Sequence, residues 1–179
     1  YFYGKEASAE YVIGTRRGIS NRKPIIGQYD INREGSRDMY SKGANLLHTI
    51  RQIAKDDEVW RKTLRGLNKE FYHSTVTTGE IEDYISKSIG VDLSKVFDQY
   101  LRDYRVPVFE YEISNGILMY RWNNVIDGFD MPLEVIIDGE NTQLYPTLEF
   151  KQVPIKNLYI NVDNDYYVYT KDLKIIIDS

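Results

Sequence analysis

The chain has 179 residues, enough for one domain or two small ones, and 42% of them are hydrophobic, which suffices for a packed core. It contains no cysteine, which excludes disulfides and thiolate metal sites, and no apolar run reaches the roughly 18 residues that span a membrane. The net charge of −4 divides unevenly, with 18 Lys+Arg against 15 Asp+Glu in residues 1–105 and 5 against 12 in residues 106–179, but neither part has the basic, aromatic stripe of a nucleic-acid-binding protein.

The chain begins with a predicted helix and a long loop. Residues 1–19 are expected to be helical, with one stripe formed by Tyr3, Ala7, Tyr11 and Gly14. Residues 20–37 are rich in turn formers and predict a loop, and loops of this length in a compact domain tend to be functional. Because this loop leads to Tyr40, we expect it to line a cleft.

The strongest helical pattern covers residues 38–53. Its apolar residues recur at the spacing of one helical face, and they are Leu46, Leu47, Ile50 and Ile53. Asp38 is expected to cap this helix or to lie in its first turn. Tyr40 is therefore predicted at the helix N-terminus, where the N–H groups favour a developing negative charge.

Three further helices follow, each with a start signal. Asp56 or Asp57 caps the first, whose predicted core face is Trp60, Leu64, Leu67 and Phe71. Thr77 and Glu80 form a capping box for the second, which turns Ile81, Tyr84, Ile85 and Ile89 inward and stops at Gly90. Asp92 caps the third, with Leu93, Val96, Phe97, Tyr100 and Leu101 on one face. Amphipathic helices with short joins predict a helical bundle.

Near Arg105 the hydrophobic period changes from helical to alternating. Seven short strands are predicted, over residues 106–113, 117–122, 133–137, 147–153, 157–162, 166–169 and 171–177, with turns at Asn115-Gly116 and Asp138-Gly139. We therefore expect an α+β protein, with a helical bundle in residues 1–105 and a small antiparallel β-sandwich in residues 106–179. Pro107 favours extended backbone before it and so supports this boundary.

The remaining polar residues favour structural roles. His48, at the edge of a core face, is expected to be a buried histidine with one hydrogen-bond partner, and His73 is expected at a helix end. Asp163-Asn164-Asp165 lacks the glycine and glutamate of an EF-hand, which favours a turn between strands. Asp56-Asp57-Glu58 indicates a helix N-terminus.

Four segments of the chain carry a family resemblance. Y-S-K-G-A with L-L-H-T-I-R, in residues 40–51, resembles the segment just past the zinc site in the aminopeptidase N family of gluzincin metallopeptidases. The likeness continues through F-Y-H-S-T-V-T-T-G-E-I at 71–81, F-D-Q-Y-L-R-D-Y-R-V-P-V-F-E-Y at 97–111 and R-W-N-N-V-I-D-G-F-D-M-P at 121–132. These segments stand in the family's order and cover most of the chain.

The resemblance implies a fold and a reaction. Residues 1–105 would be the helical second half of a thermolysin-like catalytic domain, and residues 106–179 the β-sandwich that follows it. The implied reaction is removal of N-terminal residues from peptides by zinc-activated water. The implied partners are the peptide substrate and the N-terminal domains of the full-length parent enzyme.

The zinc motif of that family, H-E-x-x-H with a downstream Glu, does not occur here, and His48 and His73 are the only histidines. In the family's order these ligands precede Tyr1, so we expect a piece of a larger enzyme. Zinc is expected in the parent and not in this chain, which by itself should be inactive because a catalytic zinc site needs three protein ligands.

Tyr40 is the candidate catalytic residue. By resemblance it matches the family's tyrosine that stabilises the carbonyl oxygen as that atom gains charge, and a phenol with a pKa near 10 stays protonated and can donate a hydrogen bond. The plainer interpretation is that Tyr40 packs its ring at a helix start. Two further alternatives stay open: a glycyl aminopeptidase relative, with a PDZ-type domain in place of the sandwich, and a scaffold of aminopeptidase shape without catalysis.

Overall fold

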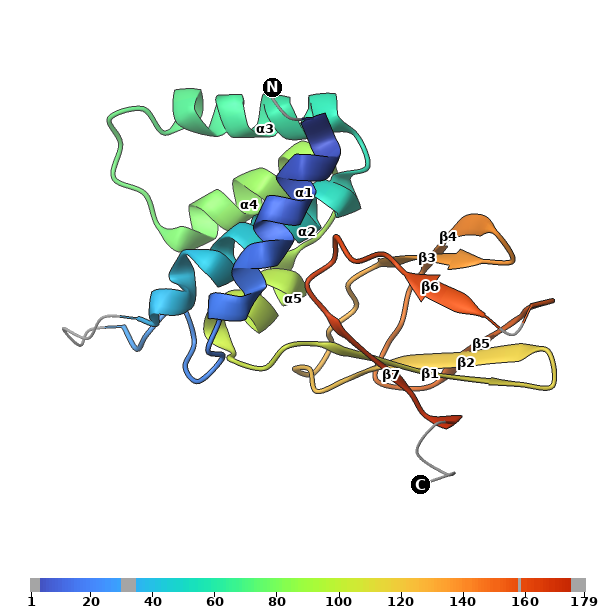
Figure 1. Ribbon diagram of the computed structural model, residues 1–179. Coiled ribbons are helices and arrows are strands. Elements are labelled where there is room, and N and C mark those ends of the chain that lie inside the picture. Colours follow the sequence, from blue (N-terminus) through green and yellow to red (C-terminus); the bar gives the residue numbers. More distant parts are fainter. Residues whose placement is uncertain (1–3, 30–34, 158, 175–179) are drawn as a thin grey trace.

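The computed structural model describes residues 4–29, 35–157 and 159–174. Within this part, helices occupy the chain as far as Arg102 and strands begin at Val108. The helices lie together at one end of the molecule and the strands at the other, as Figure 1 shows. The α+β class expected from the sequence is confirmed.

In the described residues the helical half contains five α-helices. They are α1 (Gly4–Gly14), α2 (Ser41–Ala54), α3 (Asp57–Glu70), α4 (Thr78–Ile89) and α5 (Ser94–Phe97). Short turns extend or precede them: the 3₁₀ turns η1 (Thr15–Gly18) and η2 (Arg37–Met39), and a π-helical turn, η3 (Asp98–Arg102), directly after α5.

The helix boundaries follow the local signals closely. The Asp56 carboxylate accepts hydrogen bonds from the backbone N–H groups of Glu58 and Val59, in the first turn of α3, at 2.7 and 3.2 Å. Thr77 and Glu80 form the predicted capping box of α4, and Gly90 ends that helix with a φ of 73°. Since each signal acts within a few residues of itself, these boundaries were predictable from sequence.

Three predicted apolar stripes need correction. On α1, Ala7 and Tyr11 are exposed, while Tyr3 lies outside the described residues. Leu47 on α2 is 41% exposed, and Leu64 on α3 is 39% exposed. Polar residues take the covered positions instead, because α2 contacts α1 through hydrogen bonds and α3 turns Thr63 inward beside Trp60.

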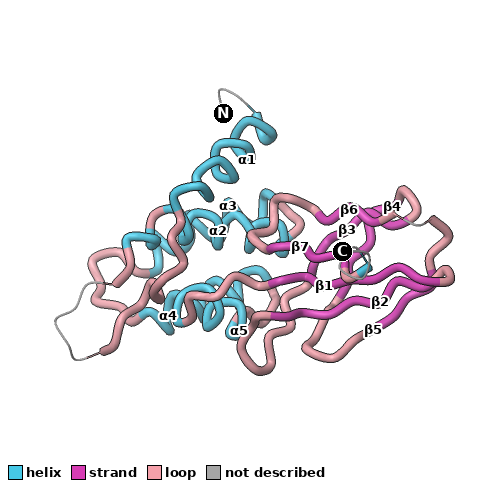
Figure 2. The backbone as a smooth tube through the Cα atoms, turned by 60° about the horizontal axis from the view of Figure 1, so that its bottom comes forward, coloured by secondary structure: helices cyan, strands magenta, loops and turns pink. Residues whose placement is uncertain are grey.

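Two sheets make up the strand half, and Figure 2 shows their strands beside the helices. The described strands are β1 (Val108–Ser114), β2 (Ile117–Asn123), β3 (Leu133–Ile137), β4 (Glu140–Leu144), β5 (Lys151–Pro154), β6 (Ile160–Val162) and β7 (Tyr169–Asp172). The larger sheet has the order β5-β2-β1-β7 and the smaller one β4-β3-β6. Both predicted hairpin turns are present, with positive φ at Asn115, Gly116, Asp138 and Gly139.

The strand prediction was wrong in two respects. Residues 140–144 form β4, which was not expected because only Leu144 of this polar segment is buried. The two strands predicted at 166–169 and 171–177 are replaced by β7, with residues 175–177 outside the description. Because β7 pairs with β1 in parallel, the larger sheet is mixed, whereas the smaller one is antiparallel as expected.

One hydrophobic cluster runs through both halves. It includes Ile50 of α2, Tyr100 of η3, Trp122 of β2 and Leu133 of β3. Tyr166 and Tyr167 are buried between the halves, where the Tyr100 hydroxyl donates to the Tyr167 carbonyl. This cluster fixes the position of α2, the helix that carries the candidate site.

Candidate functional site

Tyr40 lies at the N-terminus of α2, as predicted. Its backbone is helical, with φ −74° and ψ −63°, and its carbonyl accepts the first α2 hydrogen bond, from Ala44, at 3.0 Å. The side chain is 76% exposed. Leu47, two turns further along the same face, is exposed as well, so α2 presents an accessible surface around the phenol.

Asp38 does not cap α2, contrary to expectation. Its carboxylate is 4% exposed and accepts hydrogen bonds from the backbone N–H groups of Ser20 and Asn21, at 3.0 and 2.8 Å, and from the Ser20 hydroxyl. Burial by itself would raise the pKa of Asp38, but these hydrogen bonds outweigh it and lower the pKa. The side chain therefore fastens the start of the long loop to the turn that precedes Tyr40.

Lys42, two residues after Tyr40, is fully buried. Its Nζ donates to the carbonyl oxygens of Asp103 and Tyr104, at 3.1 and 3.3 Å. Burial lowers the pKa of Lys42, and the carboxylates of Asp38 and Asp103 oppose this shift. A buried lysine was not expected from the sequence, since lysine is almost never buried without partners.

Lys42 belongs to a stripe of buried polar residues along α2 that sequence reasoning missed. The stripe continues with Asn45, whose amide donates to Val12 and Thr15 of the α1 region, and with Thr49, whose hydroxyl accepts from the Tyr167 N–H at 2.9 Å. Positions 42, 45 and 49 have the i, i+3, i+7 spacing of one face. This spacing could have indicated a buried polar face, but only apolar residues were considered for the covered faces of the helices.

His48 is buried, as predicted, and lies beside this stripe. Its Nε2 is 3.2 Å from the Asp165 carboxylate, a close contact that lacks hydrogen-bond geometry. His73 lies beyond the end of α3 with a φ of 53°, against the ring of Tyr72. The two histidines thus contact different parts of the fold, His48 the strand half through Asp165 and His73 the ring of its neighbour Tyr72.

The long loop before Tyr40 lines a hollow of about 720 Å³ together with Arg102, in agreement with the expected cleft. The described lining residues come from the segments 23–29 and 35–36. Tyr40 is not among these lining residues. The loop is therefore connected to the turn before Tyr40 by the hydrogen bonds of Asp38, and the hollow is not part of that connection.

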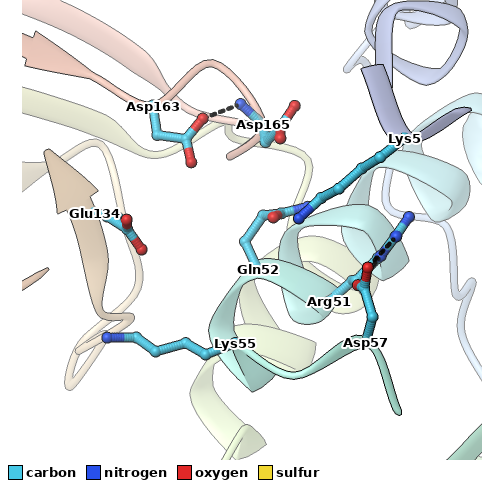
Figure 3. A pocket seen from close by; sticks show the side chains of 8 residues that line it. All are labelled: Lys5, Arg51, Gln52, Lys55, Asp57, Glu134, Asp163 and Asp165. Carbon is cyan, nitrogen blue, oxygen red and sulfur yellow. Dashed lines mark hydrogen bonds and ion pairs between the residues drawn. The ribbon is translucent and has the colours of Figure 1, made fainter. Parts of the chain in front are cut away.

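A polar cleft of about 420 Å³ lies between the two halves, and Figure 3 shows its side chains. Glu134, Asp163 and Asp165 face it from the strand half, whereas Lys5, Arg51, Gln52, Lys55 and Asp57 face it from the helices. The predicted Asx turn is present, with the Asp165 N–H donating to the Asp163 carboxylate at 2.9 Å. Burial, with the charges of Asp165 and Glu134, raises the pKa of Asp163. Opposite charges across this cleft help the halves to associate.

The described residues contain no group of three or more His, Asp or Glu side chains placed to bind a metal ion. In the same part of the chain, no helix is long and apolar enough to cross a membrane.

Comparisons with known proteins give a similarity of fold. No family model matches the chain, and no curated protein does so either. A crystal structure of Legionella pneumophila aminopeptidase A in complex with aspartic acid is similar, with a TM-score of 0.61 and 15% sequence identity. The match covers 90% of this chain but 22% of that one. The chain thus resembles part of an aminopeptidase in structure, and at this identity the likeness shows the fold alone.

Proposed function

We propose that this chain is part of a zinc-dependent aminopeptidase, the part that follows the metal ligands, and that Tyr40 is a catalytic residue of that enzyme. The observation that carries the proposal is the exposed phenol at the N-terminus of α2, within the Y-S-K-G-A segment, in a fold similar to part of an aminopeptidase. The proposed reaction is hydrolysis of the N-terminal residue from a peptide.

Tyr40 is proposed to act on the scissile carbonyl. As the peptide bond is attacked, the carbonyl oxygen gains negative charge, and the phenol donates a hydrogen bond to it. The helix N-terminus at which Tyr40 lies also favours negative charge. A donor that acts only as the charge develops lowers the barrier without tightening substrate binding.

The zinc ion would be held by residues that precede Tyr1 in the family's order. The described residues of this chain do not offer a metal-binding group, so we assign no metal ligand among them. We further propose that residues 1–105 complete the catalytic domain and residues 106–179 form the β-sandwich that follows it. The change from helices to strands between Arg102 and Val108 supports this boundary.

The two-sheet arrangement of the strand half favours the aminopeptidase N relationship over the glycyl aminopeptidase one, which would place a PDZ-type domain there. An activity assay of the complete polypeptide distinguishes an aminopeptidase from a scaffold of the same shape. The experiment is to express the complete polypeptide that carries these residues, load it with zinc, and assay it on an aminoacyl chromogenic substrate.

We expect hydrolysis that a chelator abolishes and added zinc restores. The 179-residue chain by itself should neither hydrolyse the substrate nor retain stoichiometric zinc after chelator washing. A complete polypeptide that binds zinc but does not hydrolyse any aminoacyl substrate would favour the scaffold. Stoichiometric zinc held by the 179-residue chain would contradict the placement of the ligands before Tyr1.

A further inference from the structure

The phenol of Tyr40 is exposed, yet the turn that carries it is held from both sides. Asp38 and Lys42 flank Tyr40 at two residues' distance, and both side chains are buried. They do not pair with each other, because each is bonded to a different segment of the chain. The backbone at Tyr40 is thus fixed while its side chain points to solvent.

Asp38 connects this turn to the segment that follows η1. Its carboxylate accepts hydrogen bonds from two successive backbone N–H groups and one hydroxyl, those of Ser20 and Asn21. The Ser36 hydroxyl in turn accepts from the Asp38 N–H at 3.2 Å. A carboxylate that accepts several N–H bonds is a strong and directional anchor.

Lys42 connects the same turn to the link between the helical and strand halves. Its two acceptors, the Asp103 and Tyr104 carbonyls, belong to the segment between η3 and β1. That segment is in turn connected to the strand half, since the Arg105 guanidinium binds the Asp103 carboxylate at 2.8 Å and donates to the Val125 carbonyl at 3.1 Å. The position of Tyr40 therefore depends on the strand half through Lys42.

Burying two charges that do not form an ion pair with each other is expensive, and apolar residues would serve packing alone at lower cost. What the two charges provide is a set of directional hydrogen bonds. These bonds fix residues 20–21 and 103–104 relative to the turn that carries Tyr40. We propose that Asp38 and Lys42 are positioning residues for Tyr40: they hold the turn at the start of α2 so that the phenol meets the reacting carbonyl of the substrate. This inference rests on the proposed function and adds two residues to it.

The decisive experiment is a double-mutant cycle in the complete, zinc-loaded enzyme. It compares Lys42→Met, Tyr40→Phe and the double variant, with Lys62→Met on the exposed face of α3 as the matched control. Lys42→Met should lower kcat about ten- to a hundredfold with KM changed less than about twofold, as expected for a misplaced catalytic group. In the Tyr40→Phe background the same change should lower kcat less than about twofold, because nothing remains to be positioned.

A purely structural role for Lys42 predicts a different outcome. The loss would then be equal in both backgrounds and would follow the melting temperature, and this result would overturn the inference. If Tyr40→Phe itself leaves kcat unchanged, the proposed function has failed, and the catalytic part of the inference fails with it. The two failures are thus distinguishable.

A second measurement needs no activity and uses the 179-residue chain. NMR with labelled tyrosine, assigned through Tyr40→Phe, reports the Tyr40 ring, and amide exchange reports the turn. Lys42→Met and Asp38→Asn should each shift the Tyr40 signals and speed exchange of its amide about tenfold or more, whereas Lys62→Met should do neither. Asp38→Asn keeps the inference testable if Lys42→Met does not fold. Unchanged Tyr40 signals in both folded variants would show that the anchors do not hold the residue.

Discussion

Buried charge serves different ends in the two halves of the molecule. In the strand half, Glu110 of β1 is 1% exposed and binds Arg121 of β2 at 2.8 Å, Lys171 of β7 at 3.0 Å and Asn123 at 2.8 Å. In the helical half, Asp38 and Lys42 are equally buried but bind backbone groups and a hydroxyl. Glu110 forms ion pairs with two cationic side chains, whereas Asp38 and Lys42 do not form an ion pair with each other.

This difference indicates separate roles for Glu110 and for the Asp38 and Lys42 anchors. Glu110 joins three strands of one sheet, so its contacts stabilise that sheet. Asp38 and Lys42 join segments on either side of an exposed side chain, so they stabilise a local geometry that packing does not require. Substitutions around Tyr40 should therefore change turnover, and substitutions at Glu110 should change the free energy of unfolding. Four predictions test this difference, from the largest expected effect to the smallest.

The largest effect is expected at Tyr40. In the complete enzyme, Tyr40→Phe should lower kcat about a hundred- to a thousandfold, or roughly 3–4 kcal/mol, because one donor to the transition state is lost. KM and the melting temperature should change little, since the ring and its packing remain. Steady-state kinetics on a dipeptide-like chromogenic substrate, beside a thermal melt, measure both.

Tyr72→Phe is the matched control, because Tyr72 is 74% exposed, as Tyr40 is 76% exposed, and it lies in the loop after α3. It should leave both kcat and stability unchanged. A Tyr40→Phe variant whose turnover falls less than about fivefold, well short of the oxyanion-donor range, would remove Tyr40 from the mechanism.

The next effect is expected at Glu110. Glu110→Gln should lower the free energy of unfolding by about 3 kcal/mol, near the lower end for a broken buried pair, because Arg121 and Lys171 stay partly solvated. Chemical denaturation of the 179-residue chain measures it. Glu112→Gln, two residues along the same strand, should cost about 0.5 kcal/mol or less. Equal losses in the two variants would contradict the special role of Glu110.

The ionisation of Glu110 should also make the free energy of unfolding depend on pH. Burial by itself would raise the pKa of Glu110, but hydrogen bonds from Asn123, Lys171 and Arg121 outweigh it and lower the pKa from 4.5 to about 2. The stabilisation is therefore complete above pH 4.5 and is lost as the pH falls toward 2.

At pH 3 the loss from Glu110 should reach about 2 kcal/mol, at about 1.4 kcal/mol per pH unit below the unfolded pKa. Urea denaturation between pH 6 and pH 3 should show a shallower decline in Glu110→Gln than in the parent sequence. Parallel declines in the two proteins would mean that the folded pKa is not depressed.

The smallest stability effect is expected at Lys42. Lys42→Met removes two hydrogen bonds but also removes the cost of burying an ammonium group, so the free energy of unfolding should change by about 1 kcal/mol or less. Denaturation under the conditions used for Glu110→Gln gives a direct comparison. A loss at Lys42 as large as that at Glu110 would erase the distinction between the two clusters.

Local signals in the sequence determined much of this fold. Thr77 with Glu80, Asn115 with Gly116, and Tyr40 at the start of a strong helical period each act within one turn of the chain. The change of period near Arg105 likewise marked where helices give way to strands. Because these interactions are short in range, they can be predicted without knowing what packs against them.

Only the tertiary structure decided the rest. The polar segment 140–144 becomes β4 because β3 offers it a hairpin partner, and the parallel pairing of β7 with β1 places Lys171 opposite Glu110. Asp38 was expected to cap the helix or lie in its first turn, and Lys42 carried no signal of burial. Both side chains are buried, and the groups they bind lie 17 or more residues away along the chain. The sequence by itself placed Tyr40 on its helix. The contacts that hold it there connect distant segments, and the local spacing of polar residues on α2 does not identify their partners.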